Sequence, residues 1–459
     1  MGRLWIGRLC VVLTSLAIGY LLLISTTGVR EVHQTSVTTS IVLPDPLPSA
    51  QDWPWWRGTS GQNSALNSHL PLRWSVSENV AWQTDIPGRG HSSPCIWGSN
   101  VFLSTSDTQD QTISLLCLNG DTGQVRWQTV LQRGGVPEIH QKNSHASATP
   151  ACDGQNIYVA HVEQGQLIVS AVNFMGQLQW RCPAGAYASE WGYGSSIAMH
   201  KSLVIVCADN RGRQIDRLVG TSWLAGLDRE TGKVIWRVKR PDGDSFGSPV
   251  VAHVAGRDQL LVAGQDAVSA YDPPTGDLIW KCSWNCKRTA NSVAFDDQHV
   301  FASTRQPQSE LICIRADGAG DVTQSHLVWR EKKAASDVPS PCVSGENLYS
   351  AADDGVLNCL DKATGKVRWK KRLGGNISSS PLIAGGYLYC CNEDGTTFVL
   401  DVTGQGKVVA ESMLEEGIFA SPIVSNNRIY LRTLGRLYCL VESSNAVIAD
   451  QQTNSTPRN

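Results

Sequence analysis

The stretches Asp228-Arg-Glu-Thr-Gly-Lys-Val-Ile-Trp236, Asp272-Pro-Pro-Thr-Gly-Asp-Leu-Ile-Trp280 and Asp361-Lys-Ala-Thr-Gly-Lys-Val-Arg-Trp369 repeat one pattern. Each has an Asp, then a Thr-Gly pair, and a Trp four residues after the Gly. Similar copies end at Trp127, Trp180 and Trp329, so that the repeats recur at roughly 40 to 55 residues. A tandem repeat of this length indicates stacked supersecondary units rather than one irregular core.

The copy over residues 380–410 shows what one repeat contains. Ser380-Pro381 opens a short apolar stretch, and Gly385-Gly386 turns it. Asn392-Glu-Asp-Gly395 is a hairpin turn between the second and third apolar stretches, and Thr403-Gly404 gives the positive-φ position of a last tight turn. Four short strands joined by hairpins are typical of one blade of a β-propeller.

The markers of the first, second and third strands each occur eight times. The fourth strand of the last blade is missing, because the apolar pattern ends after Leu440. Asn79-Val-Ala-Trp82-Gln-Thr84 has the fourth-strand pattern at the other end of the chain. We therefore predict an all-β protein, an eight-bladed propeller of four-stranded blades over residues 80–441, closed by this N-terminal strand. The first-strand markers are Ser93, Thr149, Ser196, Ser248, Ser292, Ser340, Ser380 and Ser421.

The repeated Trp has a structural explanation. An indole buries a large apolar area and still offers one N–H donor. We expect each repeat Trp to pack between neighbouring blades and to donate to a backbone carbonyl of the next turn, with the Thr-Gly pair setting its register. The structural repeat tryptophans are Trp82, Trp127, Trp180, Trp236, Trp280, Trp329 and Trp369.

The Asp-x-x-Thr-Gly-x-x-x-Trp unit resembles the tryptophan-docking repeat of pyrroloquinoline-quinone (PQQ) propellers. The resemblance covers residues 80–441, and the lead-in Trp53-Pro-Trp-Trp-Arg-Gly58 with Trp74 resembles that of secreted PQQ-binding-like propellers of planctomycete-type bacteria. This family includes quinoprotein dehydrogenases and non-enzymatic scaffolds such as the outer-membrane assembly factor BamB. The repeat specifies the fold, and the fold alone does not specify an activity.

The N-terminus is interpreted as a targeting segment, with Arg3 and Arg8 before 21 uncharged residues, Leu9 to Val29. Residues 1–29 are expected to be either a cleaved signal peptide or a membrane anchor helix. The basic flank predicts an extracytoplasmic, periplasmic propeller. If residues 9–29 are retained, they tether the propeller to the inner membrane. Residues 30–50 are expected to be a flexible linker, 51–79 a lead-in segment and 442–459 a disordered tail. A net charge of −2 without a basic run argues against a nucleic-acid partner.

The fourteen cysteines recur at blade positions, which favours small buried hydrophobic residues over disulfides. Cys117, Cys313, Cys359 and Cys439 share one third-strand position. Two local pairs are left. Cys282 and Cys286 could bridge their own loop, whereas Cys390-Cys391 resembles the vicinal disulfide of some quinoprotein dehydrogenases but lies on a strand, where adjacent side chains face opposite ways.

A functional site is expected where the loops that follow the outermost strands meet around the central channel. The two longest loops are residues 133–147, with histidines, and 184–195, with aromatic residues and one carboxylate. The residues proposed to bind a ligand on this loop face are His91, His145, Glu190, Trp191, Tyr193 and Asn291. The simpler interpretation of His91 and His145 is that they are hydrogen-bonded loop histidines. The simpler interpretation of Trp191 is an aromatic side chain packed at the rim.

The family resemblance implies what an enzyme would need here: PQQ in a planar slot with an aromatic floor, calcium on several oxygen ligands, and an aspartate base. Glu190, Asn291 and Asp337 are single candidates for these roles, with Asp337 the weak candidate for the catalytic base. They form no motif, so the sequence assigns neither a cofactor nor a metal.

Three functions fit the sequence. The first is a non-catalytic scaffold that resembles BamB and binds protein partners at the cell envelope, which we favour because the fold alone supports no chemistry. The second is a quinoprotein, PQQ- and calcium-dependent dehydrogenase of alcohols or sugars. The third is a propeller that binds an extracellular carbohydrate or other small ligand through its aromatic loops.

Overall fold

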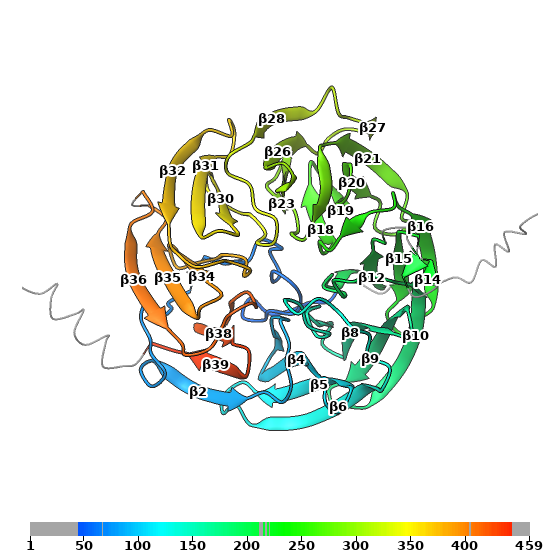
Figure 1. Cartoon of the computed structure of the whole chain (residues 1–459), viewed down its shortest axis with the longest axis vertical. Helices are drawn as coiled ribbons and strands as arrows, with labels where there is room; N and C mark the ends of the chain where they lie inside the picture. The colour runs from blue at the N-terminus through cyan, green and yellow to red at the C-terminus, as the bar shows by residue number, and fades with distance from the viewer. Residues whose placement is uncertain are drawn as a thin grey trace, which may run out of the picture. The chain divides into compact units, whose positions relative to one another are not determined.

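The computed structural model describes residues 45–66, 68–210, 214–215, 218–219, 221–403 and 405–442. Within these residues all regular structure is β-strand, and four-stranded sheets are arranged in a ring around a common centre (Figure 1). The predicted anchor over 9–29, most of the predicted linker and the predicted tail beyond residue 442 lie outside the described residues. Nothing among the described residues is a helix with the length and apolar character needed to cross a bilayer.

The first four sheets of the ring follow the chain, each with its strands in sequence order. Neighbouring strands are antiparallel, and most are joined by short hairpins, whereas the connection between β12 and β15 is longer. The sheets are β3 (Cys95–Trp97), β4 (Asn100–Asp107), β5 (Thr112–Asn119) and β6 (Val125–Arg133); β7 (Ala151–Cys152), β8 (Asn156–Glu163), β9 (Gln166–Asn173) and β10 (Leu178–Ala186); β11 (Ala198–His200), β12 (Leu203–Ala208), β15 (Trp223–Asp228) and β16 (Val234–Lys239); and β18 (Val250–Val254), β19 (Arg257–Ala263), β20 (Ala267–Tyr271) and β21 (Leu278–Ser283).

The remaining four sheets complete the ring, and the last of them takes its outer strand, β2, from the N-terminal part of the described chain. They are β23 (Ala294–Phe295), β24 (His299–Thr304), β26 (Glu310–Arg315) and β28 (Leu327–Glu331); β29 (Cys342–Ser344), β30 (Asn347–Ala352), β31 (Val356–Asp361) and β32 (Val367–Arg372); β33 (Leu382–Ala384), β34 (Tyr387–Cys391), β35 (Thr396–Asp401) and β36 (Val408–Met413); and β37 (Ile423–Ser425), β38 (Arg428–Arg432), β39 (Arg436–Leu440) and β2 (Val80–Asp85).

Short strands are added to these sheets or lie between them. β1 (Ser64–Ala65) pairs with β33, and β27 (Gly320–Asp321) pairs with the outer strand β21. A small hairpin, β13 (Gln214–Ile215) and β14 (Leu218–Val219), follows β12, and a three-stranded sheet joins β17 (Asp244–Ser245), β22 (Cys286–Thr289) and β25 (Gln306–Pro307). The additions to β33 and β21 cover strand edges that would otherwise be free.

The ring closes as the sequence predicts. β2 pairs with β39 in antiparallel register, with Trp82 opposite Cys439. The first and last parts of the described chain are therefore joined in one sheet, and they lie side by side in Figure 1. Because this sheet shares one hydrophobic core with neighbouring residues of β4 and β34, the closure is held by apolar packing as well as by backbone hydrogen bonds.

The predicted docking of the repeat tryptophans is confirmed at four positions. The indole nitrogens of Trp82, Trp127, Trp180 and Trp329 each donate to a carbonyl of the next blade's outer turn, at 2.9 to 3.0 Å. The glycine of that turn lies against the indole, and a Cβ on Gly123 would come within 2.5 Å of Trp82. Gly123 also has a φ of +72°, so both space and conformation require glycine there.

Trp280 and Trp236 depart from this prediction. Trp280 donates to the side-chain Oε1 of Gln259 in its own sheet, at 2.7 Å. The following blade has no Thr-Gly turn after β26, which removes the usual acceptor for Trp280. The indole nitrogen of Trp236 is buried without a hydrogen-bond partner, although its ring packs against Gly276 in the next blade as the pattern requires.

The first-strand markers have a role that the sequence did not reveal. The backbone N–H of one marker donates to the side-chain hydroxyl of the next marker around the channel, as from Ser93 to Thr149 at 3.1 Å and from Thr149 to Ser196 at 3.0 Å. The ring returns to its start where the Ser93 hydroxyl donates to the Ser421 carbonyl at 2.8 Å. The hydroxyl of six markers accepts this bond inside the closely packed wall, which explains the small hydroxyl residue there; these markers are Thr149, Ser196, Ser248, Ser340, Ser380 and Ser421.

The cysteines of the described residues are all free, and all but Cys182 are buried. Burial raises the pKa of the Cys117 and Cys391 thiols to about 12. Cys282 and Cys286 do not form the loop bridge that was left open, and Cys390-Cys391 lies on β34 without a vicinal disulfide. The structural interpretation of these residues as small hydrophobic side chains is confirmed.

Candidate functional site

The open end of the central channel holds a cavity of about 480 Å³, which we call the loop-face basin. Antiparallel strands place the turns between second and third strands on the same face as the loops between blades. Every one of the eight inter-blade loops contributes to the basin, together with the turn residues Asp353 and Glu393. Its principal side chains are His91, His140, Lys142, Trp191, Phe246, Arg288, Asp337, Val338, Asp353, Glu393 and Phe419.

Trp191 is the central aromatic side chain of the basin. Its ring centroid lies 4.2 Å from that of His140, and the Arg288 guanidinium lies 5.1 Å from its ring. Its backbone carbonyl accepts a hydrogen bond of 2.6 Å from the Asn143 side chain, which ties the two longest loops together. The indole is therefore contacted by a histidine and by a cation, and its negative π-face attracts the cation.

Asp337 lies beside this aromatic group. One carboxylate oxygen is 3.7 Å from the Arg288 guanidinium, and the other is buried without a hydrogen-bond partner. The backbone N–H of Asp337 donates to Asp353 at 2.8 Å, which brings a second carboxylate close. Burial and the charge of Asp353 raise the pKa of Asp337 to about 6, although Arg288 and Arg305 oppose the shift. Asp337 can thus exchange a proton near neutral pH.

His91 also lines the basin, stacked on Phe419 with ring centroids 4.6 Å apart. Burial, with the nearby charges of Arg89 and Arg432, lowers the pKa of His91 to about 3. The imidazole is consequently neutral at physiological pH, and its Nε2 has no hydrogen-bond partner. At this position His91 contributes a flat, uncharged surface rather than a cation.

The other predicted loop residues lie outside the basin. Tyr193 is buried and donates its hydroxyl to the Cys207 carbonyl at 3.2 Å. Asn291 is fully buried, and its amide nitrogen donates to the carbonyls of Ser303 and Ser336 at 3.0 and 3.1 Å. The Glu190 side chain is exposed to solvent. The His145 side chain is partly buried, and this burial lowers its pKa. The structure thus brings His91, Trp191 and Asp337 together and gives Tyr193 and Asn291 local structural bonds.

Several basin residues escaped the sequence analysis. Arg288, Phe246 and Phe419 belong to the shorter inter-blade loops, which carry no motif. Asp353 and Glu393 belong to acidic hairpin turns, for which the turn alone is a sufficient explanation. The strand order could have indicated them, because in an antiparallel blade the turn between the second and third strands lies on the same face as the long loops.

The opposite end of the channel is closed by the lead-in segment. Arg57 is buried there, and its guanidinium donates to the carbonyls of Val293 at 3.1 Å and Pro341 at 2.6 Å. Asn63 donates to the Pro381 carbonyl at 2.8 Å, and Trp53 pairs with Ile96 through their backbones. The Trp-Pro-Trp-Trp-Arg-Gly stretch therefore fastens separate blades across the channel, and the basin opens on one face.

The described residues of the basin supply no cluster of carboxylates for the calcium ion that the family resemblance implies. A calcium ion takes several oxygen ligands together. Among the described residues, no three His, Cys, Asp or Glu side chains gather closely enough to hold a metal. Trp191 could form an aromatic floor, but its ring is already contacted by His140 and Arg288. We therefore derive no chemical step through a quinone.

Comparisons with known proteins agree with the fold. A relative, the outer membrane protein assembly factor BamB of Shewanella oneidensis, is 22% identical over 287 residues, 58% of this chain and 66% of that protein, just under two thirds of its length. The crystal structure of BamB from Moraxella catarrhalis covers 80% of this chain and 98% of its own, at 15% identity and a TM-score of 0.56. A quinohemoprotein alcohol dehydrogenase from Comamonas testosteroni covers 85% of this chain and 80% of its own, at 11% identity and a TM-score of 0.61.

These structural likenesses, at such low identity, show the propeller fold and leave the activity open. The match to a family is broader. The family described as outer membrane protein assembly factor BamB matches residues 64–217, 220–318 and 318–458, which is most of the chain. The chain belongs to this BamB-like family of PQQ-repeat propellers.

Proposed function

We propose that this protein is an extracytoplasmic scaffold that binds a partner protein of the cell envelope through the loop-face basin, without redox turnover. The observation that carries the proposal is the composition of the basin. It combines aromatic and aliphatic surface, from Trp191, Phe246, Val338 and Phe419, with charged groups of both signs. Such a mixture of apolar contacts and charged positions is what protein recognition requires.

The charged groups of the basin form ion pairs, and a bound protein can replace one member of each pair with its own charged group. Arg288 lies 3.7 Å from Asp337, and Lys142 lies 3.9 Å from Glu393. The Lys142 side chain is 64% exposed, so its ammonium group can reach an acidic group of a partner at little cost. The Shewanella oneidensis relative and the matching family support a partner at the envelope, since both are described as an outer membrane protein assembly factor.

Co-purification from envelopes tests this function. The protein would be isolated with a tag from detergent-extracted membranes, and the proteins that accompany it would be quantified by mass spectrometry. Arg288→Glu is expected to reduce a specific envelope protein at least about tenfold, because it places a like charge beside Asp337. Lys281→Glu is the matched control, because it makes the same charge reversal beside an aspartate away from the basin. Lys281 lies on the outer strand β21, and its ammonium group is 3.6 Å from the Asp321 carboxylate. Equal recovery with both variants would contradict the proposal.

A quinoprotein dehydrogenase is the second candidate, and one observation favours it. Asp337, with a pKa raised to about 6, lies in a cavity next to an aromatic ring, as a general base would. Titration of the protein with PQQ and calcium tests this candidate by thermal shift and by dye reduction with alcohols and sugars. Saturable stabilisation with dye reduction that is lost in Asp337→Asn would establish the enzyme. Stabilisation by sugars alone would instead indicate the third function, a carbohydrate-binding propeller.

A further inference from the structure

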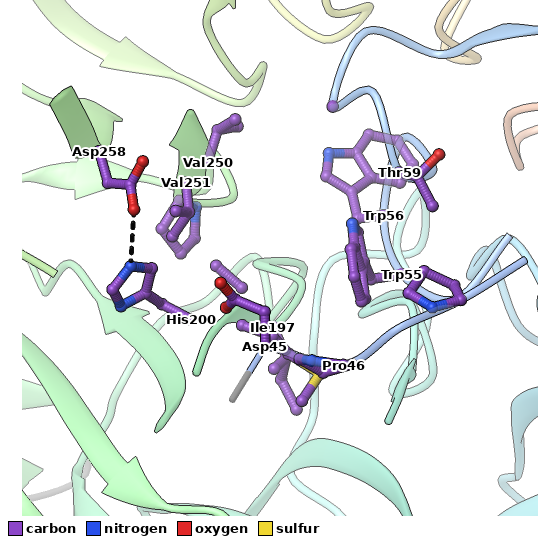
Figure 2. A pocket seen from close by; sticks show the side chains of 15 residues that line it. Asp45, Pro46, Trp55, Trp56, Thr59, Ile197, His200, Val250, Val251 and Asp258 are labelled. Carbon is purple, nitrogen blue, oxygen red and sulfur yellow. Dashed lines mark hydrogen bonds and ion pairs between the residues drawn. The ribbon is translucent and has the colours of Figure 1, made fainter. Parts of the chain in front are cut away.

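A second cavity lies beside the lead-in segment, on the face of the ring opposite the loop-face basin. Its volume is about 350 Å³. Figure 2 shows the indoles of Trp55 and Trp56 on one side of it and the His200–Asp258 pair on the other. The first strands of two neighbouring blades, β11 and β18, supply apolar walls through residues such as Met199 and Val250. The cavity thus has an aromatic side, an acidic side and an apolar base.

The charges around this cavity are mainly negative. Asp45 and Asp258 line it, and neither a lysine nor an arginine side chain is among its lining residues. Asp258 accepts hydrogen bonds from His200 at 3.1 Å and from His253 at 2.8 Å, and these bonds lower the pKa of its carboxyl group. The carboxylate is therefore ionised and held in place. Asp45 is anchored too, because it accepts a bond of 2.6 Å from the Lys201 backbone N–H.

We propose that this cavity is a binding site for a small organic cation, an alkylammonium group with an apolar body, which would lie against Trp55 and Trp56 with its charge toward Asp45 and Asp258. Indole faces attract cations, and quaternary ammonium groups are recognised by aromatic side chains with nearby negative charge. The aliphatic base accommodates the alkyl part of the ligand. The site is separate from the loop-face basin, so it does not depend on the scaffold function.

A metal ion fits the cavity less well than an organic cation. The described residues include no group of three His, Cys, Asp or Glu side chains that could hold a metal. The Trp56 indole N–H is engaged, since it donates to the Ser292 hydroxyl at 3.0 Å. That bond fixes the indole in place, so the aromatic side of the cavity exists before any ligand arrives.

Calorimetric titration of the full protein with choline tests the proposal. The uncharged isostere 3,3-dimethylbutan-1-ol is the ligand control, because it keeps the shape and removes the charge. We expect saturable binding of choline and at least about tenfold weaker binding of the isostere. Tetramethylammonium and a primary diamine would show whether the site prefers quaternary or primary ammonium groups. Equal binding of choline and its isostere, or no binding of any ammonium compound, would overturn the proposal.

Two pairs of variants assign the binding to this cavity. Trp55→Leu removes the π-system and is expected to weaken choline at least about fivefold, whereas Trp55→Phe keeps an aromatic ring and loses less. Asp258→Asn is expected to weaken choline at least about fivefold, whereas Asp85→Asn on β2, an exposed carboxylate paired with Arg436, leaves it unchanged. A thermal melt of each variant shows whether it is folded. If folded Trp55→Leu and Asp258→Asn bind choline as the unaltered protein does, the site is not this cavity.

Discussion

The two ends of the central channel are built in different ways. At the closed end, Arg57 and Asn63 of the lead-in donate to backbone carbonyls of separate blades, and Arg57 is 1% exposed. At the open end, Arg288 is partly exposed and its partners are side chains, Trp191 and Asp337. At the closed end, the hydrogen bonds are made to backbone atoms held within the sheets. At the open end, the contacts are between side chains, which can change partners. The comparison separates residues that hold the ring from residues that are free to bind.

The largest expected effect is at the closed end. Arg57→Ala leaves the Val293 and Pro341 carbonyls without their donor and empties a buried volume, which we expect to cost about 3 kcal/mol of unfolding free energy. The matched change at the open end, Arg288→Ala, is expected to cost less than about 1 kcal/mol because its ion pair is partly exposed. Chemical denaturation of both variants measures the difference. Similar losses would mean that the two ends do not differ in this way.

Acid stability gives the next largest effect. His161 on β8 is buried with neither ring nitrogen bonded, and burial, with Arg181 nearby, lowers its pKa from 6.5 to about 3. The unfolded chain then binds a proton more readily than the folded protein. The contribution of His161 to the free energy of unfolding is therefore fully present above pH 6.5 and falls as the pH is lowered toward 3. By pH 5 the loss is about 2 kcal/mol for this histidine.

Denaturation midpoints at pH 7 and pH 5 measure this loss. His161→Leu is expected to remove part of the pH dependence. His91→Gln at the open end, where the pKa is also about 3, should remove a smaller part, because the basin can admit water to a protonated imidazole. A pH dependence that is unchanged in both variants would show that neither histidine is responsible.

The smallest effect compares two docking tryptophans of the ring itself. Trp127 donates to the Phe174 carbonyl at 2.9 Å, whereas the Trp236 nitrogen has no partner. Trp127→Phe is expected to cost about 1 kcal/mol more than Trp236→Phe, because only the first loses a hydrogen bond. Thermal melts of the two variants provide the comparison, and a larger loss in Trp236→Phe would reverse this interpretation of the repeat.

The same contrast explains what could be predicted from the sequence. The Thr-Gly and Trp positions recur in blade after blade, so their spacing predicted the strands, the closure by β2 and the docking of Trp82 against Gly123. The lead-in occurs once, and no periodicity indicates that Arg57 donates to the Val293 and Pro341 carbonyls of two blades. In the basin, Arg288 and Asp337 meet through loops of different blades, and such contacts depend on the closed ring rather than on any local pattern.

Site-specific photo-crosslinking tests the central claim most directly. A photoreactive residue would replace Val338, which is 39% exposed in the loop-face basin, or Leu278, which is 49% exposed on the outer strand β21. After illumination in intact cells, we predict a discrete crosslink to one envelope protein from position 338, absent from position 278 and lost when Arg288→Glu is added. Equal crosslinking from both positions, or none from position 338, would contradict a scaffold that binds through its open end.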